Sequence, residues 1–136
     1  MLAPMRQRES PLDAHKALIL CVDDEELPLT LRKLVLQKQG YEVISARSAA
    51  EALQILESRS VDLVLTDHLM PGGTGTELAK SVKHVWPDLP VILISGVNEI
   101  PLDARYADLF ISKVEGPAAM CQKISAVLAN QGHAHE

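Results

Sequence analysis

Polar residues that could do chemistry stand directly after short apolar runs of this sequence. They are Asp23-Asp24-Glu25 after Ala17–Val22, Asp67 after Val61–Thr66, Ser95-Gly96 closing Pro90–Ser95, and Lys113 after Asp108–Ser112. Carboxylates that converge in one pocket repel each other unless a cation is present, and hard oxygen ligands of this kind suit Mg²⁺. If these runs are neighbouring strands, the pattern predicts a divalent metal site with a hydroxyl and a lysine close by.

The apolar runs alternate with helical patterns from Lys16 onward, which indicates crossover connections. The expected strands are Ala17–Val22, Tyr41–Ala46, Val61–Thr66, Pro90–Ser95 and Asp108–Ser112. Such alternation predicts the α/β class, with a doubly wound, five-stranded parallel sheet of flavodoxin-like order 2-1-3-4-5 and helices on both faces. In that order a ligand crevice lies at the carboxyl ends of the first and third strands.

Helices are predicted from three-and-four apolar spacing and from end signals. The expected helices are Glu26–Gln39, Ala49–Ser58, Leu78–Val85 and Pro117–Asn130. For the first, we take Leu27, Leu31, Leu34, Val35 and Lys38 as the repeat and Gly40 as the stop. Ser48–Glu51 and Thr74–Glu77 have the form of capping boxes. The stretch Gly96–Ala107 leaves room for one short helix, around Leu102–Ala107, so we expect a shortened or irregular fourth helix.

Length and composition indicate one domain. At 136 residues with 47% apolar content, one core is expected. We assign residues 1–15 to a flexible leader, 16–130 to the domain and 131–136 to a tail that includes His133 and His135. Cys21 and Cys121 are expected to fill apolar space, because two isolated cysteines make neither a disulfide framework nor a metal-binding pair.

Charge and hydropathy exclude several function classes. The net charge is −5 and there is no extended basic run, so direct nucleic-acid binding is not expected. No apolar stretch approaches the roughly 20 residues that cross a bilayer, and Met1–Ser10 lacks the apolar centre of a signal peptide. We therefore expect a cytoplasmic protein without membrane insertion.

Five segments together carry a family resemblance. They are Ile19–Glu25, Gly40–Val43, Asp67–Gly75, Ile92–Gly96 and Phe110–Lys113. In this order, each near a strand end, they resemble the receiver domains of two-component response regulators over about Ala17–Ala129. Any one of these segments alone would be a weak signal.

The resemblance implies a phosphorelay role and a role for each matching residue. Asp67 would accept a phosphoryl group from a histidine kinase or a histidine phosphotransfer protein, because a carboxylate is a competent nucleophile and gives a labile acyl phosphate. The implied metal ligands are Asp23, Asp24, Asp67 and the backbone carbonyl of Leu69, with Mg²⁺ as the ion and Mn²⁺ as a possible substitute. Lys113 and Ser95 would bind phosphoryl oxygens, and Ser95 with Phe110 would form the switch that alters contacts with an unknown downstream protein.

The sequence departs from the family pattern at Lys113-Val114 and in the stretch from Ser95 to Lys113, which is several residues shorter than usual. Val114 follows Lys113 where the family has proline, so a trans peptide is expected there, since a cis bond before a residue other than proline costs about 3 kcal/mol. Leu69 and Val97, two residues beyond the acceptor and the switch hydroxyl, are apolar where hydrolysis needs a positioned water. We therefore expect self-catalysed phosphoryl acceptance with slow autodephosphorylation, and no other enzyme activity.

Two other functions remain open at this point. One is a receiver-like interaction module that is not phosphorylated, and the other is a metal-dependent phosphatase, for which no cap segment or substrate pocket is evident. A stand-alone regulator and a receiver excised from a hybrid kinase are equally compatible with the sequence.

Overall fold

The computed structural model describes residues 16–70, 73–96 and 106–134. The predicted leader, Val97 and most of the predicted short helix around Leu102–Ala107 lie outside these ranges.

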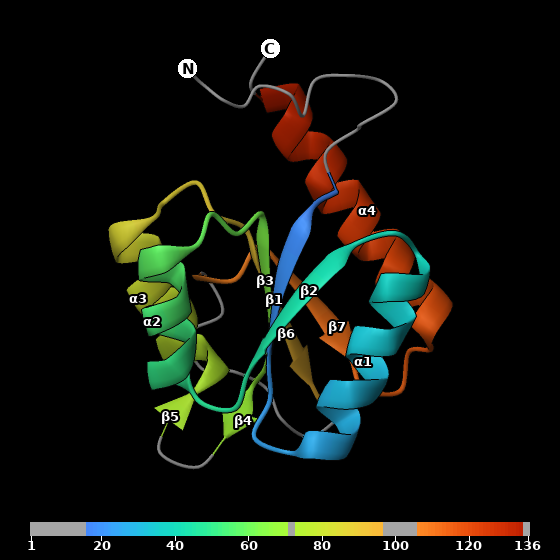
Figure 1. The fold of residues 1–136 in the computed structure, drawn as a ribbon, viewed down its shortest axis with the longest axis horizontal. Helices are drawn as coiled ribbons and strands as arrows, with labels where there is room; N and C mark the ends of the chain where they lie inside the picture. The colour runs from blue at the N-terminus through green and yellow to red at the C-terminus, as the bar shows by residue number, and fades with distance from the viewer. Residues whose placement is uncertain (1–15, 71–72, 97–105, 135–136) are drawn as a thin grey trace.

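One parallel sheet forms the centre of the molecule (Figure 1). Its strands are β1 (Leu18–Val22), β2 (Glu42–Ala46), β3 (Leu63–Asp67), β6 (Val91–Ser95) and β7 (Leu109–Ser112). Their order is β2-β1-β3-β6-β7, and every neighbouring pair is parallel. The predicted fold class and strand order are confirmed.

Helices cover both faces of the sheet (Figure 1). They are α1 (Glu26–Lys38), α2 (Ala49–Ser58), α3 (Gly75–Val85) and α4 (Pro117–Ala134). Strand residues alternate between the faces, so Ile19 and Cys21 pack in one apolar cluster with α1 and α4, while Leu20 and Val22 pack in another with α2 and α3. Within the described ranges, every helix is too short or too polar to span a bilayer.

The strands and α1 differ from the predicted bounds by one or two residues, and two other helices differ by more. Helix α3 begins at Gly75, before the predicted Leu78, and α4 continues to Ala134, beyond the predicted Asn130. The short antiparallel pair β4 (Leu69–Met70) and β5 (Gly73–Thr74) was not predicted. Strands of two residues show no periodicity that sequence reasoning can detect.

The predicted apolar face of α1 is wrong. Leu27, Leu31 and Leu34 are exposed by 68%, 53% and 56%, whereas Leu29 and Leu36 are buried against the sheet. The helix carries leucine on both of its sides, so its spacing fits two different stripes. The helix is correct, and its leucine-rich outer stripe faces solvent.

The two predicted capping boxes have different outcomes. Thr74 and Glu77 form a complete box at the start of α3. At α2, Ser48 accepts the N–H of Glu51, but the Glu51 carboxylate accepts the N–H of Arg47 at 2.7 Å instead of closing the box. The Glu51 side chain therefore fixes the backbone of Arg47, a residue that contacts the site.

Gly75 allows α3 to start against the end of β3. Its N–H donates to the carbonyl of His68 at 2.6 Å. A Cβ placed there would collide with the backbone carbonyl of Asp67, would lie 2.6 Å from Cδ2 of Leu93 and would lie 3.0 Å from Cα of His68. Because two of these atoms are backbone, the collision cannot be relieved by a side-chain rotation.

Replacing Gly75 with alanine is expected to lower the free energy of unfolding by about 3 kcal/mol, because extra volume in a packed core forces backbone shifts. Gly116→Ala is the matched control, since a Cβ at Gly116 meets nothing within 4 Å. Urea unfolding of both variants measures the effect. Equal stability of the two variants would contradict the close approach described here.

Candidate functional site

Three aspartates meet at the carboxyl edge of the sheet. Asp23 and Asp24 follow β1, and Asp67 ends β3, the strand paired with β1. One carboxylate oxygen from each lies within 4.8 Å of the others. The predicted convergence of these carboxylates is therefore present in the structure.

Asp67 lies deepest in this group. It is buried, and burial is the largest cause that raises the pKa of its carboxyl, with the charge of Asp23 adding to it and Lys113 opposing it. Its Oδ1 lies 3.0 Å from Nζ of Lys113, an ion pair whose angles fall short of a hydrogen bond. In the described part of the chain no other donor contacts this oxygen. An unsatisfied, buried carboxylate oxygen is available to a metal or to an incoming phosphorus.

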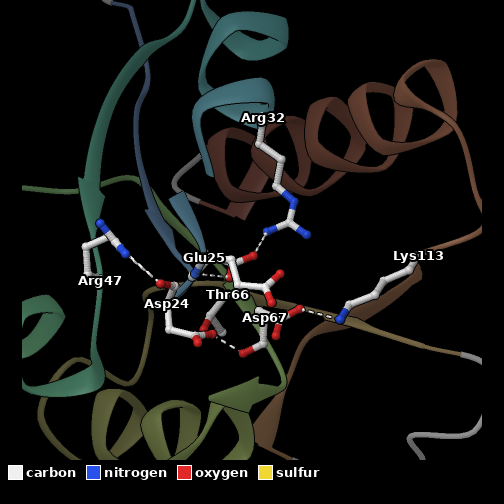
Figure 2. Close-up of polar contacts among 8 residues, drawn as sticks. Asp24, Glu25, Arg32, Arg47, Thr66, Asp67 and Lys113 are labelled. Carbon is white, nitrogen blue, oxygen red and sulfur yellow. Dashed lines mark hydrogen bonds and ion pairs between the residues drawn. The ribbon is translucent and has the colours of Figure 1, made fainter. Parts of the chain in front are cut away.

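Asp23 is the most completely engaged of the three carboxylates. Its Oδ1 accepts the N–H of Glu25 at 2.9 Å, and its Oδ2 accepts a hydrogen bond from Nη1 of Arg32 at 2.6 Å. Figure 2 shows the Arg32 side chain reaching from α1 toward the acidic group. Arg32 was not predicted as a site residue.

Asp24 is held through its backbone. Nε and Nη2 of Arg47 donate to the Asp24 carbonyl at 3.1 and 2.8 Å (Figure 2). The contact joins residues 23 positions apart, so no local pattern could have revealed it. Because the carbonyl is taken by Arg47, the loop after β1 is fixed while the Asp24 carboxylate remains directed at the other two acids.

Lys113 lies in the loop after β7, and hydrogen bonds hold the backbone of this loop at Lys113 and at Val114. Its N–H donates to the Ser95 carbonyl at 2.9 Å, which extends the β6–β7 pairing by one step. No cis peptide occurs in the described residues, so the predicted trans bond before Val114 is confirmed. The Val114 N–H donates to Oγ of Ser112 at 3.2 Å, a bond that proline could not make.

The same loop is tied to α4 by an ion pair. Nζ of Lys123 lies 2.8 Å from Oε1 of Glu115 and also donates to the Phe110 carbonyl at 3.3 Å. The hydrogen bond from Lys123 is the main cause that lowers the pKa of Glu115. The second oxygen of Glu115 accepts the Ser112 N–H at 2.8 Å. These contacts connect the lysine loop, β7 and α4.

The remaining predicted residues are Ser95, Leu69 and Phe110. Ser95 is buried at the end of β6, next to β3. Leu69 begins β4, two residues beyond Asp67, with its side chain 49% exposed. Phe110 is half-buried in β7, the outermost strand, and strand alternation places it on the face opposite Ile111.

Three residues that contact this group were missed by sequence reasoning: Arg32, Arg47 and Thr66. Thr66 is buried and donates to the Asp67 carbonyl at 3.0 Å. Arg32 is a charged residue between Leu29 and Leu36 on the inward face of α1, and this position could have marked it as a site residue. Choosing the other leucine stripe as the inward face hid that signal.

An open groove reaches the acidic group from the side of α1 and α4. It measures ≈ 340 Å³ and is lined by Asp23 and Lys113 near the acids and by Leu31, Val35 and Met120 farther out. A larger hollow of ≈ 630 Å³ lies between α2 and α3, and none of the predicted site residues lines it. The smaller groove is therefore the one with access to the chemistry.

Comparison with known proteins identifies the family. The sequence profile of the response regulator receiver domain matches residues 19–125. The chain belongs to this family.

Related sequences include whole regulators and kinases. The receiver domain is 32% identical over 120 residues to the phosphate regulon transcriptional regulatory protein PhoB of Pseudomonas aeruginosa, a match that covers 84% of this chain and 52% of PhoB. It is 38% identical over 87 residues to the CAI-1 autoinducer sensor kinase/phosphatase CqsS of Vibrio cholerae, covering 62% of this chain and 13% of CqsS. The chain thus spans about half of PhoB and less of CqsS.

Solved structures agree with the fold. The response regulator TrrA of Thermotoga maritima, in complex with Mg²⁺ and BeF, has a TM-score of 0.77 and 32% identity, over 82% of this chain and 98% of that one. A CheY-like receiver domain protein of Methanospirillum hungatei has a TM-score of 0.82 and 30% identity, and the match covers 88% of this chain and 99% of that one.

Asp67→Asn is expected to stabilise this receiver domain in EDTA at neutral pH, because burial disfavours the charged form of the Asp67 carboxyl. The folded chain holds the Asp67 proton more tightly than the unfolded chain, because its folded pKa is raised. The wild type therefore loses stability as the pH rises from the unfolded pKa through the folded pKa, and the variant does not.

Urea unfolding of both proteins across this pH range measures the difference, which should vanish in acid. Asp88→Asn, at an exposed position, controls for loss of one negative charge. A destabilised Asp67→Asn variant in EDTA would show that the ion pair with Lys113 outweighs the burial of Asp67.

Proposed function

We propose that this receiver domain accepts a phosphoryl group on Asp67 from a phosphohistidine and changes its protein contacts in response. The observation that carries the proposal is a buried acceptor carboxylate that lies beside two further carboxylates and forms an ion pair with Lys113. A purely structural domain would gain nothing from this repulsion, which costs stability.

The transfer follows from the placement of these groups. An oxygen of Asp67 attacks phosphorus in line with the bond to be broken; the O–P bond forms as the P–N bond breaks. The electron pair of the P–N bond returns to the imidazole of the donor, which takes up a proton from solvent. Nζ of Lys113, 3.0 Å from Oδ1, is close enough to pair with a phosphoryl oxygen once the phosphoryl group is attached.

The residues present fit a divalent cation. Asp23, Asp24, Asp67 and the carbonyl of Leu69 would hold Mg²⁺, or Mn²⁺ in its place, because carboxylate and carbonyl oxygens are their usual ligands. When bound, the ion neutralises charge on the transferring phosphoryl oxygens. The presence of Mg²⁺ in the TrrA complex supports this assignment.

The switch would start from Ser95 and Phe110. Ser95 lies in the strand next to Asp67, so its hydroxyl can turn to a phosphoryl oxygen, and Phe110 in β7 can then move inward. The phosphoryl group would persist, since Leu69 is apolar and cannot position a water for hydrolysis. No other enzyme activity is proposed, and the domain would work in the cytoplasm, where histidine kinases present their phosphohistidine.

Incubation with acetyl phosphate and Mg²⁺ is expected to give a single phosphoryl adduct by intact mass, absent in Asp67→Asn and in EDTA. Asp88→Asn should be labelled like the wild type. Turnover of the donor without an adduct would indicate a phosphatase instead, and the absence of both would favour an interaction module.

After removal of the donor, Leu69→Asn should lose the phosphoryl group several-fold faster than the wild type, because its amide can hold a water.

Docking of the phosphodonor is assigned to the exposed leucine stripe of α1. Leu31 lines the groove that leads to the acids, and Leu27 and Leu34 continue the exposed apolar stripe on the same helix. Large exposed apolar groups on one helix face mark a protein contact. A histidine kinase or histidine phosphotransfer protein presents its histidine on a helix, which suits a stripe of this kind.

Leu31→Asp is expected to slow phosphotransfer from a phosphorylated histidine phosphotransfer domain by about tenfold or more, the usual effect of losing a central interface residue. Labelling by acetyl phosphate should stay unchanged, because the small donor needs no docking. Val85→Asp on α3, 58% exposed, is the matched control. Equal effects of both substitutions on transfer would remove α1 as the docking surface.

A further inference from the structure

Arg32 is a charged residue on the sheet side of α1. Its side chain is 16% exposed, and its Nη1 lies 2.6 Å from Oδ2 of Asp23. Leu29 and Leu36, on the same side of the helix, are buried in the core. An arginine among buried leucines is costly unless its charge is paired, so the contact with Asp23 is built into the fold.

Arg32 changes the charge that a divalent ion would meet at the site. Three carboxylates converge, and two cations contact them: Lys113 on Asp67 and Arg32 on Asp23. The two pairs leave one negative charge uncompensated, against two positive charges on a divalent ion. The charge of Arg32 neutralises part of the negative charge that would attract the ion.

We propose that Arg32 is a positioning residue that competes with the divalent cation for Asp23 and thereby weakens Mg²⁺ binding. The inference rests on the proposed function, since it takes the three aspartates as the metal site. The domain would then bind Mg²⁺ only at a higher concentration than its carboxylates alone would need. Arg32 would stabilise the metal-free form more than the Mg²⁺-bound form.

Neither of the other two cations near the site plays this part. Lys113 pairs with the acceptor carboxylate from the opposite side, where the phosphoryl group would arrive. Arg47 donates to the Asp24 backbone carbonyl and is exposed, so its charge is screened by water. Among the described residues, Arg32 is the one cation that pairs with Asp23, and its side chain is largely buried.

The expected effect follows from repulsion between the guanidinium and the ion. Even when water screens the two charges, repulsion between a single and a double positive charge several ångströms apart changes affinity by about tenfold. Linkage requires the converse as well, because Mg²⁺ must weaken the hold of Arg32 on Asp23 by the same factor. The substitution should therefore destabilise the metal-free chain more than the Mg²⁺-saturated chain.

The test is a calorimetric titration of Mg²⁺ into the unphosphorylated wild type, Arg32→Gln and Lys33→Met. Glutamine keeps a donor for Asp23 without the charge, and Lys33 is the neighbouring cation on α1, without an ion pair to Asp23. Arg32→Gln should bind Mg²⁺ about tenfold more tightly than the wild type, and Lys33→Met should bind it like the wild type. Urea unfolding of the same proteins with and without saturating Mg²⁺ is an independent measurement, and it should give the same ratio of Mg²⁺ affinities between Arg32→Gln and the wild type.

A second measurement needs no variant and covers the case in which Arg32→Gln fails to fold. The guanidinium resonances of Arg32 in the wild type should move toward those of a free arginine as Mg²⁺ is added. Unchanged resonances at saturation, or equal or weaker Mg²⁺ binding by Arg32→Gln, would overturn the proposal. Failure of the wild type to bind Mg²⁺ at all would instead remove the metal from the proposed function.

Discussion

Repulsion among three carboxylates at one edge of a parallel sheet is the constraint on which the site depends. The parallel order of β1 and β3 makes their ends coincide, and the loop after β1 adds Asp23 and Asp24 to Asp67, which ends β3. Burial of the Asp67 carboxyl, with the charge of Asp23 adding to it, raises its pKa. A carboxylate kept short of positive charge responds strongly to any cation or phosphoryl group that arrives, which is the property a switch needs.

The fold can keep the three carboxylates close together because backbone contacts fix the rest of this edge of the sheet. Gly75 brings α3 against the end of β3, Arg47 holds the Asp24 carbonyl, and the Lys113 N–H continues the β6–β7 pairing. Two apolar clusters, one on each face, clamp the central strands between helix pairs. The acids therefore cannot relieve their repulsion by moving apart, and the energy remains available at the site.

The sheet and the acids were predictable because their signals are local. Each buried strand is a short apolar run, and each site residue stands at or directly after the end of one. The face of α1 was not predictable from spacing, since Leu27-Leu31-Leu34 and Leu29-Leu36 both fit a helical stripe. Arg32 and Arg47 were missed for a related reason: their partners lie on other elements, and only the packing of α1 and the α2 loop on the sheet edge brings them together.

The loop that carries Lys113 shows how the family's proline can be replaced. A free N–H at Val114 would be unsatisfied if the loop kept the shape that proline gives, and here it donates to the Ser112 hydroxyl. Glu115 accepts the Ser112 N–H and pairs with Lys123, which also donates to the Phe110 carbonyl. The lysine at the acids and the aromatic residue of β7 are thus joined by one network through α4.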